Sequence, residues 1–277
     1  MISTLFARLV ALIGAFMILW RKTTTPQPPQ AIGGAPSIPA ARPQGSLPTL
    51  KMPTAKGWAD GHMPKAAPGL KVNAFAKDLK HPRWMEVLPN GDVAVAEARF
   101  EPGGPATSIF DFAMQSTMRR AAALGDSPNR ITLLRDRDGD GVADERFLFL
   151  EKQWQPFGMA LVGDTFYVGN TDALLTFDYK DAATKLEGPT AKLMDFKPGG
   201  HWTRSLLLSP DKTKLYAGVG SLSNIGDDGM EAEKGRACIY EIDLKTGSSR
   251  IFASGLRNPV GLAWEPTTGA LWTVVNE

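Results

Sequence analysis

The sequence predicts an all-β protein of the propeller class, and three observations lead to this prediction. Four stretches of the chain share one register, in which a polar residue, an apolar strand, a turn rich in Pro, Gly, Asp or Asn, and a second apolar strand follow one another; they are residues 81–95, 155–168, 201–217 and 258–272. Each stretch predicts a β-hairpin. The hairpins recur every ~45 to ~75 residues, a spacing typical of propeller blades. Outside the apolar N-terminus, only one segment has a helical pattern.

Further strands are expected between the hairpins, because short segments that alternate in polarity or carry β-branched and aromatic residues lie between turn signals. These segments are residues 70–75, 130–135, 147–150, 174–179, 238–244 and 249–252. The one helical pattern covers residues 108–124, where apolar residues follow a helical spacing and Gly125 provides a stop. We expect this helix to be an insertion between two strands of one blade.

The length of the chain limits the number of blades. At roughly 40 to 50 residues a blade, the ~210 residues from Gly69 to Glu277 supply about four blades, whereas a closed propeller of this kind needs about six or seven. The chain also stops within an apparent strand, at residues 271–277. We therefore expect an incomplete propeller in the N-terminal part of a longer protein.

Two appendages precede the propeller. Residues 1–22 are apolar without interruption from Leu9 to Trp20 and have basic residues on both sides, which predicts an apolar helix that acts as a signal peptide or a membrane anchor. Residues 23–68 are expected to form a solvated linker, because the part from Thr23 to Pro53 contains eight prolines and few large apolar side chains. The folded domain then covers residues 69–277.

Composition excludes several classes of function. The 277 residues are 43% hydrophobic and 22% charged, which is typical of a chain with a substantial folded core. The net charge is only +2 and the basic residues form no stripe, so nucleic acid is not an expected partner. The single cysteine, Cys238, rules out an internal disulfide and fits no zinc-binding pattern. It lies in an alternating segment, where we expect a buried structural thiol.

The predicted fold indicates where function lies. In a propeller, the loop that enters each innermost strand opens onto the central axis. The four hairpins begin with His81, Gln155, His201 and Asn258. We therefore expect these four polar side chains around one mouth of the ring.

Several phrases of the sequence reach beyond architecture. They are His-Trp-Thr-Arg-Ser-Leu-Leu-Leu-Ser-Pro-Asp at 201–211, Tyr-Ala-Gly-Val-Gly-Ser at 216–221, and Gly-Leu-Arg-Asn-Pro-Val-Gly-Leu-Ala-Trp at 255–264. Taken in this order after Gln-Pro-Phe-Gly-Met at 155–159, they resemble the soluble-type, PQQ-dependent glucose/sorbosone dehydrogenases. That family is built on six-bladed propellers, and the resemblance covers residues ~70 to 277.

The resemblance implies roles for single residues. The general base of the family is a His at the start of an inner strand, which His201 matches. An Arg-Asn pair before Pro-x-Gly-Leu contacts the quinone and corresponds to Arg257 and Asn258, while a Gln that enters an earlier inner strand corresponds, more loosely, to Gln155. The residue before the family's His is often an acid that orients the imidazole, but here it is Gly200. The family's calcium loop and its later basic cofactor ligands would follow the end of this chain.

The implied activity is oxidation of an aldose or related sugar with PQQ, and the electrons pass on to a respiratory acceptor. PQQ carries three carboxylates, so its binding calls for planar, permanently charged donors and a hard cation such as calcium. A neutral imidazole can accept the hydroxyl proton of the sugar as hydride leaves the same carbon. The resemblance further implies that the body is periplasmic, secreted or anchored to the inner membrane by residues 1–22, which would provide the membrane contact.

A second candidate site is an acidic loop. Asp136, Asp138, Asp140 and Asp144 occupy positions one, three, five and nine of an EF-hand-like loop, with Gly141 at the sharp turn. The twelfth position holds Phe in place of the bidentate Glu of an EF-hand. The loop therefore predicts either a structural calcium site or an ordinary Asp-Gly turn between two strands.

Two other functions remain open from the sequence. A calcium-dependent lactonase-like hydrolase on a propeller would need acidic and amide side chains around an axial metal, and Glu97, Asn170 and Asn276 are the candidates. A propeller without catalytic activity would instead present its faces to a binding partner. Lactone hydrolysis without quinone would favour the first of these, and binding that does not depend on His201 would favour the second.

Overall fold

The computed structural model describes residues 54–59, 61–101 and 108–276. These residues belong to two compact units, of which the smaller contains residues 54–56 and 116–122 and the larger contains all the strands. No helix within the described ranges is long and apolar enough to cross a bilayer. The predicted N-terminal segment 1–22 and residues 23–53 of the predicted linker lie outside these ranges, and residues 61–68 form neither helix nor strand.

The one predicted helix is present as α2 (Ile109–Arg120). Its first turn is capped by Ser108, whose Oγ accepts a hydrogen bond of 3.0 Å from the backbone N of Asp111. The helix ends before the expected stop at Gly125, because Ala122 has a left-handed φ of 55° and breaks the helical ladder. In the smaller unit, the backbone N of Ala55 donates to the last carbonyl of the helix at 3.4 Å.

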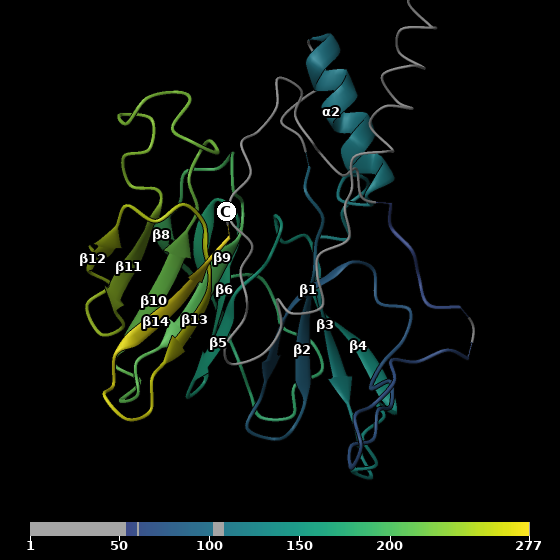
Figure 1. Cartoon of the computed structure of the whole chain (residues 1–277). Helices are drawn as coiled ribbons and strands as arrows, with labels where there is room; N and C mark the ends of the chain where they lie inside the picture. Colours follow the sequence, from purple (N-terminus) through teal and green to yellow (C-terminus); the bar gives the residue numbers. More distant parts are fainter. Residues whose placement is uncertain (1–53, 60, 102–107, 277) are drawn as a thin grey trace, which may run out of the picture. The chain divides into compact units, whose positions relative to one another are not determined.

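Within the described residues, fourteen strands form four antiparallel sheets in which each strand pairs with the next along the chain (Figure 1). The first sheet contains β1 (Pro82–Val87), β2 (Val93–Glu97), β3 (Arg130–Arg135) and β4 (Glu145–Leu150). The second contains β5 (Met159–Val162), β6 (Thr165–Gly169), β7 (Ala173–Asp178) and β8 (Ala191–Asp195). The third contains β9 (Arg204–Leu208), β10 (Lys214–Val219), β11 (Cys238–Asp243) and β12 (Ser249–Ser254), and the last β13 (Pro259–Trp264) and β14 (Leu271–Val275).

All four predicted hairpins are confirmed, as β1–β2, β5–β6, β9–β10 and β13–β14. The expected strand at residues 70–75 is wrong. That segment lies against the acidic loop instead. Asn73 Nδ2 donates to the Gly141 carbonyl at 2.7 Å, and the Phe75 carbonyl accepts from Ala143 N at 2.8 Å. Strand β8 was not expected, because this edge strand is mostly exposed and its sequence therefore lacks a buried alternating face.

The first strand of each sheet contacts the first strand of the next, so that β1, β5, β9 and β13 lie side by side in that order. Glycines allow the close approach. A Cβ atom at Gly158 would lie 2.5 Å from the Arg204 carbonyl oxygen, to which the Gly158 N–H donates at 2.9 Å. A Cβ at Gly218 would lie 2.5 Å from the Pro259 carbonyl. This radial stacking of four-stranded meanders is the arrangement of a propeller-like fold.

The hydrophobic core lies between consecutive sheets. One buried cluster joins the first and second sheets, with Phe149 and Phe166 in edge-to-face contact at 5.5 Å between ring centroids. A second cluster joins the second and third sheets and contains Cys238, which is fully buried. Burial raises the pKa of the Cys238 thiol to about 11, which confirms the expected structural thiol. Full burial of a large apolar side chain such as Phe149 or Phe166 contributes about 1.5 to 3 kcal/mol to the free energy of folding.

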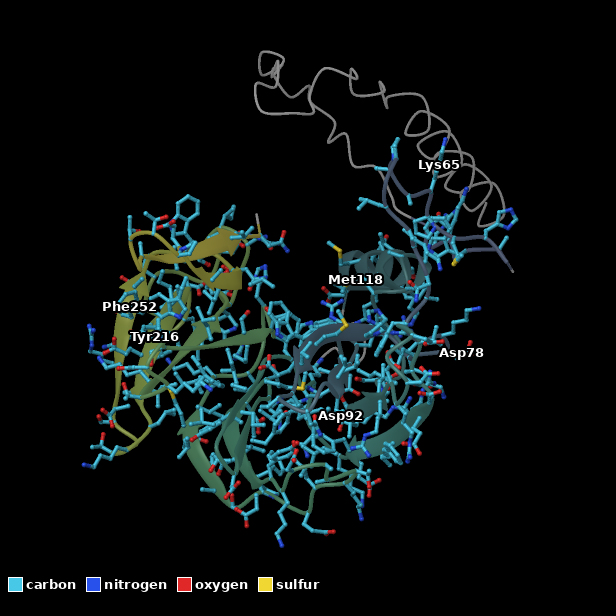
Figure 2. All side chains as sticks on the ribbon, turned by 90° about the horizontal axis from the view of Figure 1, so that it is seen from below. Lys65, Asp78, Asp92, Met118, Tyr216 and Phe252 are labelled. Carbon is cyan, nitrogen blue, oxygen red and sulfur yellow. The ribbon has the colours of Figure 1, made fainter. Side chains whose placement is uncertain are left out.

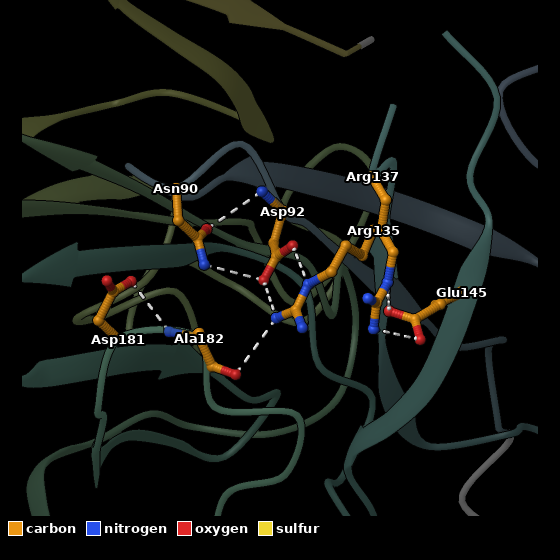
Figure 3. Close-up of polar contacts among 7 residues, drawn as sticks. All are labelled: Asn90, Asp92, Arg135, Arg137, Glu145, Asp181 and Ala182. Carbon is orange, nitrogen blue, oxygen red and sulfur yellow. Dashed lines mark hydrogen bonds and ion pairs between the residues drawn. The ribbon is translucent and has the colours of Figure 1, made fainter. Parts of the chain in front are cut away.

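A buried ion pair also ties the first sheet to the second (Figure 3). Arg135 of β3 donates through Nε and Nη2 to the two carboxylate oxygens of Asp92 at 2.7 and 2.6 Å. The same guanidinium donates to the carbonyl of Ala182, which follows β7, at 3.2 Å. Asp92 is 3% exposed. Loss of one partner would leave the other charge buried and unpaired, so this contact fixes the spacing of the two sheets.

The third and last sheets are joined by an aromatic cluster around Tyr216. Its ring packs edge-on against Phe252 of β12 and Trp264 of β13, at 5.1 and 5.2 Å between centroids, and Figure 2 shows Tyr216 and Phe252 side by side. The Tyr216 hydroxyl donates to Glu241 at 2.7 Å. Burial, together with this hydrogen bond, raises the pKa of Tyr216 to about 12.

Candidate functional site

The entrances of the innermost strands meet in an aromatic cluster. Trp84 of β1 packs against Phe157, which precedes β5, at 5.1 Å, and Phe157 packs edge-on against Trp202, which precedes β9, at 6.1 Å. Val260 of β13 packs against the same cluster. The guanidinium of Arg83 lies 5.1 Å from the centroid of the Trp202 ring. Segments from all four sheets therefore converge at one place, as the predicted fold requires.

His201 lies in the loop that enters β9, next to this cluster, and its side chain is half-buried. Its backbone N donates to the Ser221 carbonyl at 2.9 Å, and Nδ1 of the ring lies 3.1 Å from the same carbonyl and 3.2 Å from Ser221 Oγ. The hydroxyl of Ser221 donates to the Ser223 carbonyl at 2.6 Å, so Oγ acts as an acceptor toward the ring. Because both neighbours of Nδ1 accept, we assign the proton to Nδ1, which leaves Nε2 with its lone pair.

The environment favours the neutral form of this imidazole. Burial lowers the pKa of His201 below its ordinary value of 6.5, and the positive charges of Arg257 and Arg236 lower it further. The hydrogen bond to Ser221 and the charge of Glu233 act in the opposite direction and are outweighed. His201 is therefore neutral at pH 7 and able to accept a proton at Nε2.

Gly200 explains why no acid precedes His201 in this chain. Its φ is +58°, in the left-handed region, and a Cβ atom there would lie 2.2 Å from the Leu222 carbonyl oxygen. No side chain can be accommodated without moving the backbone of the neighbouring loop. Ser221 instead orients the imidazole. It is the last residue of the Tyr-Ala-Gly-Val-Gly-Ser phrase at 216–221.

Arg257 and Asn258 lie directly beside His201. The carbonyl of Arg257 accepts a hydrogen bond of 2.7 Å from Ser221 N, so one residue links the entrance of β13 to His201. The Arg257 guanidinium donates through Nε and Nη2 to Asn224 at 3.0 and 2.5 Å and through Nη1 to the Asn276 carbonyl at 2.5 Å. A guanidinium has five N–H donors, so two are not used by the described residues.

Asn258 is 5% exposed and packs against the same glycine as His201. A Cβ at Gly220 would lie 2.4 Å from His201 Cβ and 2.5 Å from Asn258 Oδ1, so only glycine allows these two side chains to meet. Asn258 Oδ1 accepts from Thr203 Oγ1 at 3.3 Å. Its amide Nδ2 is not engaged by the described part of the chain and is available as a donor. The predicted residues His201, Arg257 and Asn258 therefore form one site.

Gln155 and His81 are placed differently. Gln155 is 3% exposed, its Nε2 donates to the Arg99 carbonyl at 3.0 Å, and its backbone N donates to Asn129 Oδ1 at 3.1 Å. These bonds tie the entrance of β5 to the loops of the first sheet. His81 directly precedes β1 and has a positive φ of 59°, and its carbonyl accepts from Ala98 N at 3.3 Å. The side-chain bond of Gln155 thus leads to the first sheet and not to His201.

Arg204 has a structural role. Its side chain is fully buried, and it donates to the carbonyls of His201, Thr203 and Lys197 at 2.8, 2.9 and 2.9 Å. Burial, together with the positive charge of Arg236, lowers the pKa of Arg204 to about 9. The buried guanidinium thus holds the loop before β9 in place through these three carbonyls.

The acidic loop brings together three of its four aspartates. The carboxylate oxygens of Asp136, Asp138 and Asp144 all lie within 4.8 Å of one another. Asp140 is not part of this group, and its Oδ1 accepts from Val142 N at 2.8 Å. Glu145, which follows Asp144 in the chain, forms an ion pair of 2.7 Å with Arg137 (Figure 3). The three carboxylates are a donor set suited to a hard cation such as calcium.

The candidate metal ligands of a lactonase-like site are used otherwise. Glu97 is fully buried, and its two oxygens accept from Arg130 at 2.9 and 3.2 Å and also from Thr132. Asn170 donates to Gln153 at 3.1 Å. Asn276 is bound through its carbonyl to the side chain of Arg257 and through its N–H to Asn258. The carboxylate that such a metal site would need is therefore neutralised by an arginine.

Comparison with known proteins agrees with this geometry. The TrAA12-like family model matches residues 129–277, which is more than half of the chain and includes His201, Arg257 and Asn258. The chain belongs to the TrAA12-like family. The resemblance to PQQ-dependent sugar dehydrogenases seen in the sequence is confirmed by this family model together with the solved structures. No curated protein matches the sequence.

Solved structures share the fold of this TrAA12-like chain. The holo PQQ domain of pyranose dehydrogenase from Coprinopsis cinerea matches with a TM-score of 0.58 at 20% identity, over 76% of this chain and 47% of that one. The calcium structure of the family AA12 enzyme from Trichoderma reesei matches with a TM-score of 0.58 at 20% identity, over 76% and 49%. An oxidoreductase of Thermus thermophilus, described as a glucose dehydrogenase, matches at 0.51 and 18%, over 74% and 60%. The chain thus spans about half the length of the first of these structures.

Proposed function

We propose that the protein is a PQQ-dependent dehydrogenase that oxidises an aldose or related sugar with His201 as general base. The observation that carries the proposal is the meeting of His201, Arg257 and Asn258 at the entrances of β9 and β13. Their hydrogen bonds through Ser221 and their packing on Gly220 leave Nε2 of the imidazole and donors of the guanidinium and amide unused by the described residues.

These residues fit an anionic quinone. The two unused N–H donors of Arg257 form a planar, permanently charged pair that suits a carboxylate or quinone oxygen. The Nδ2 amide of Asn258 adds a neutral donor beside it. When bound, PQQ would supply the oxidant that receives the hydride from the sugar carbon. The resemblance of the sequence implies a cofactor contact for Gln155 as well, but its bonds to Arg99 and Asn129 support a role in positioning the β5 entrance.

His201 contributes the proton transfer. Its Nε2 accepts the hydroxyl proton of the sugar, while Nδ1 keeps its own proton, which it donates to the Ser221 acceptors, and this bond keeps the ring in one orientation. Because the pKa of His201 is lowered, the base is already neutral at pH 7. The activity should fall as the pH decreases through that lowered pKa, because protonated His201 cannot accept a proton. A respiratory acceptor would then take the electrons.

The proposal includes a larger ring. Six blades, of which this chain supplies about four, would cover the exposed apolar side chains at both ends of the series of sheets. Met85 and Val87 of β1 are 65% and 67% exposed, and Trp272 and Val274 of β14 are 66% and 73% exposed. We further propose an apolar N-terminal helix that acts as a signal or anchor, and calcium bound by Asp136, Asp138 and Asp144 as a structural ion.

The experiment is a reconstitution of the full-length protein with PQQ and calcium, followed by dye reduction with a panel of sugars. Substituting His201→Gln should reduce kcat by about 10²- to 10⁴-fold, the usual contribution of a general base. The control His62→Gln removes an exposed histidine and should leave the rate unchanged. If the wild-type protein neither binds PQQ by absorption spectroscopy nor reduces the dye with any sugar, the proposed function is wrong.

A further inference from the structure

The orientation of His201 depends on the relative position of two loops. One loop, residues 197–203, carries His201 into β9, and the other, residues 220–224, carries Ser221 away from β10. Among the described residues, Ser221 holds the ring, because its carbonyl accepts from both the backbone N and Nδ1 of His201. A shift of one loop against the other would therefore rotate the imidazole or break its hydrogen bond.

Arg236 is inserted between these two loops. Its side chain is 3% exposed, and Nη1 donates to the carbonyls of Lys197 and Pro198 at 2.5 and 3.2 Å. Nη2 donates to the Gly199 carbonyl at 2.5 Å and to the Ser221 carbonyl at 3.3 Å. The same Ser221 oxygen that holds the imidazole is thus also held by the guanidinium.

Glu233 binds the second loop through its carboxylate. It is 8% exposed, and its carboxylate accepts from Leu222 N at 2.7 Å, from Ser223 N at 3.0 Å and from Ser223 Oγ at 3.2 Å. The backbone N of Arg236 donates to the Glu233 carbonyl at 2.8 Å, so the two side chains come from one turn. That turn offers an anion to the N–H groups of the Ser221 loop and a cation to its carbonyl.

We propose that Glu233 and Arg236 are positioning residues for the base, which together fix the two loops so that Ser221 holds the Nδ1–H tautomer of His201. The proposal deepens the proposed function, because it assigns a role relative to the same base. Neither side chain needs to contact cofactor or substrate. Sequence reasoning missed both residues, since they precede β11 and are 32 and 35 positions from His201 along the chain.

The charges of the pair provide a specific test. The charged groups that act on His201 are Arg257, Arg236 and Glu233, and burial is the largest influence of all. Arg236 lowers the pKa of His201 and Glu233 raises it. Substitution of one residue should therefore move the pKa upward and substitution of the other downward. A general loss of packing would move it in one direction only, toward the ordinary value of a solvated imidazole.

The experiment is NMR titration of imidazole nitrogens in ¹⁵N-histidine-labelled protein without cofactor or sugar. The sequence contains three histidines, so His201→Gln identifies the signal. In the wild type we expect the Nδ1–H tautomer. Arg236→Gln should raise the His201 pKa and Glu233→Gln should lower it. Arg236→Lys keeps the charge and should retain a pKa near the wild-type value, while its lost fork geometry increases exchange between tautomers.

Matched controls come from the same turn. Glu231→Gln and Lys234→Gln remove equal charges from exposed side chains and should leave both the pKa and the tautomer unchanged. If Arg236→Gln does not fold, Arg236→Lys and Glu233→Gln carry the test. Folded variants in which the pKa and tautomer of His201 equal those of the wild type would overturn the proposal. This titration requires no quinone, so its result is independent of whether the dye-reduction assay supports dehydrogenase activity.

Discussion

At the scale of single residues, glycine decides what the site can contain. Gly220 lets His201 and Asn258 approach each other, since a Cβ atom would lie within 2.5 Å of both side chains. Gly200 adopts a φ of +58°, and its Cα lies so close to the backbone of Leu222 that a Cβ atom would clash with it. The hydrogen bonds that orient His201 therefore come from the Ser221 loop rather than from an adjacent acid. Both glycines are therefore needed for the arrangement of the site, because a side chain at either position would clash with its neighbours.

We predict that Gly200→Asp, which introduces an acid before His201, lowers both stability and activity. The new Cβ would lie 2.2 Å from the Leu222 carbonyl, and the left-handed conformation is strained for a non-glycine residue, at a cost of about 1 to 3 kcal/mol. Thermal denaturation and kcat would be measured together. The control Gly247→Asp has a similar φ of +70° but no atom near its Cβ, so it should cost less. A rise in kcat with Gly200→Asp would contradict this explanation.

At the scale of elements, the turns between strands carry the polar groups with specific partners. The acidic loop between β3 and β4 folds on its own carboxylates, with Asp136 accepting from Gly139 N at 2.8 Å and from Gly141 N at 2.9 Å. The spacing of acidic residues in the sequence predicted four ligands, but the loop turns Asp140 toward Val142. The loop therefore departs from the EF-hand pattern at its fifth position, Asp140, whereas the first, third and ninth positions come together.

We predict that calcium stabilises this loop and raises the melting temperature of the protein. Ligand at 100 times its dissociation constant adds about 2.7 kcal/mol to the free energy of unfolding. Asp138→Asn removes one of the three clustered carboxylates and should abolish most of the calcium-dependent increase, whereas Asp126→Asn, at an exposed position outside the loop, should preserve it. Melting curves with calcium and with a chelator measure the difference. Equal curves for the wild type would show that the loop is an ordinary turn.

At the scale of the larger unit, the stacking of sheets forms the hydrophobic core. Apolar clusters fill the interfaces between the first and second sheets and between the second and third, and Arg135 of the first sheet also donates to the Ala182 carbonyl of the second. The outer face of β1 and the face of β14 lack such an interface in the described residues. Large apolar side chains there are more than 60% exposed, at Met85, Val87, Trp272 and Val274. Apolar surface of this kind favours association.

We predict that the 277-residue chain self-associates at micromolar concentration through these faces. The double substitution Trp272→Gln with Val274→Thr should shift the equilibrium toward monomer, because it removes apolar area from the face of β14. The control pair Ile225→Gln with Met230→Gln removes equally exposed apolar side chains from a loop and should not change the association. Sedimentation velocity measures both. A wild-type chain that stays monomeric throughout this range would show that the faces do not associate.

The amino-acid sequence by itself determined the hairpins, most of the other strands and the family. Strands β3 and β11 begin where their alternating patterns begin, because the period of polarity is a local property that each strand needs in order to bury one face. It also predicted His201, Arg257 and Asn258 as site residues, since these residues lie in phrases with a fixed order around the inner strands.

Only the tertiary structure decided what surrounds those residues. Ser221, Glu233 and Arg236 hold His201 through hydrogen bonds between loops that are distant in the chain, and Gln155 turned to the loops of the first sheet. The expected strand at residues 70–75 was lost to contacts with the acidic loop. The physical reason is the same in each case: periodicity encodes how a segment folds on itself, whereas the partner of a polar group is set by how the sheets pack against one another.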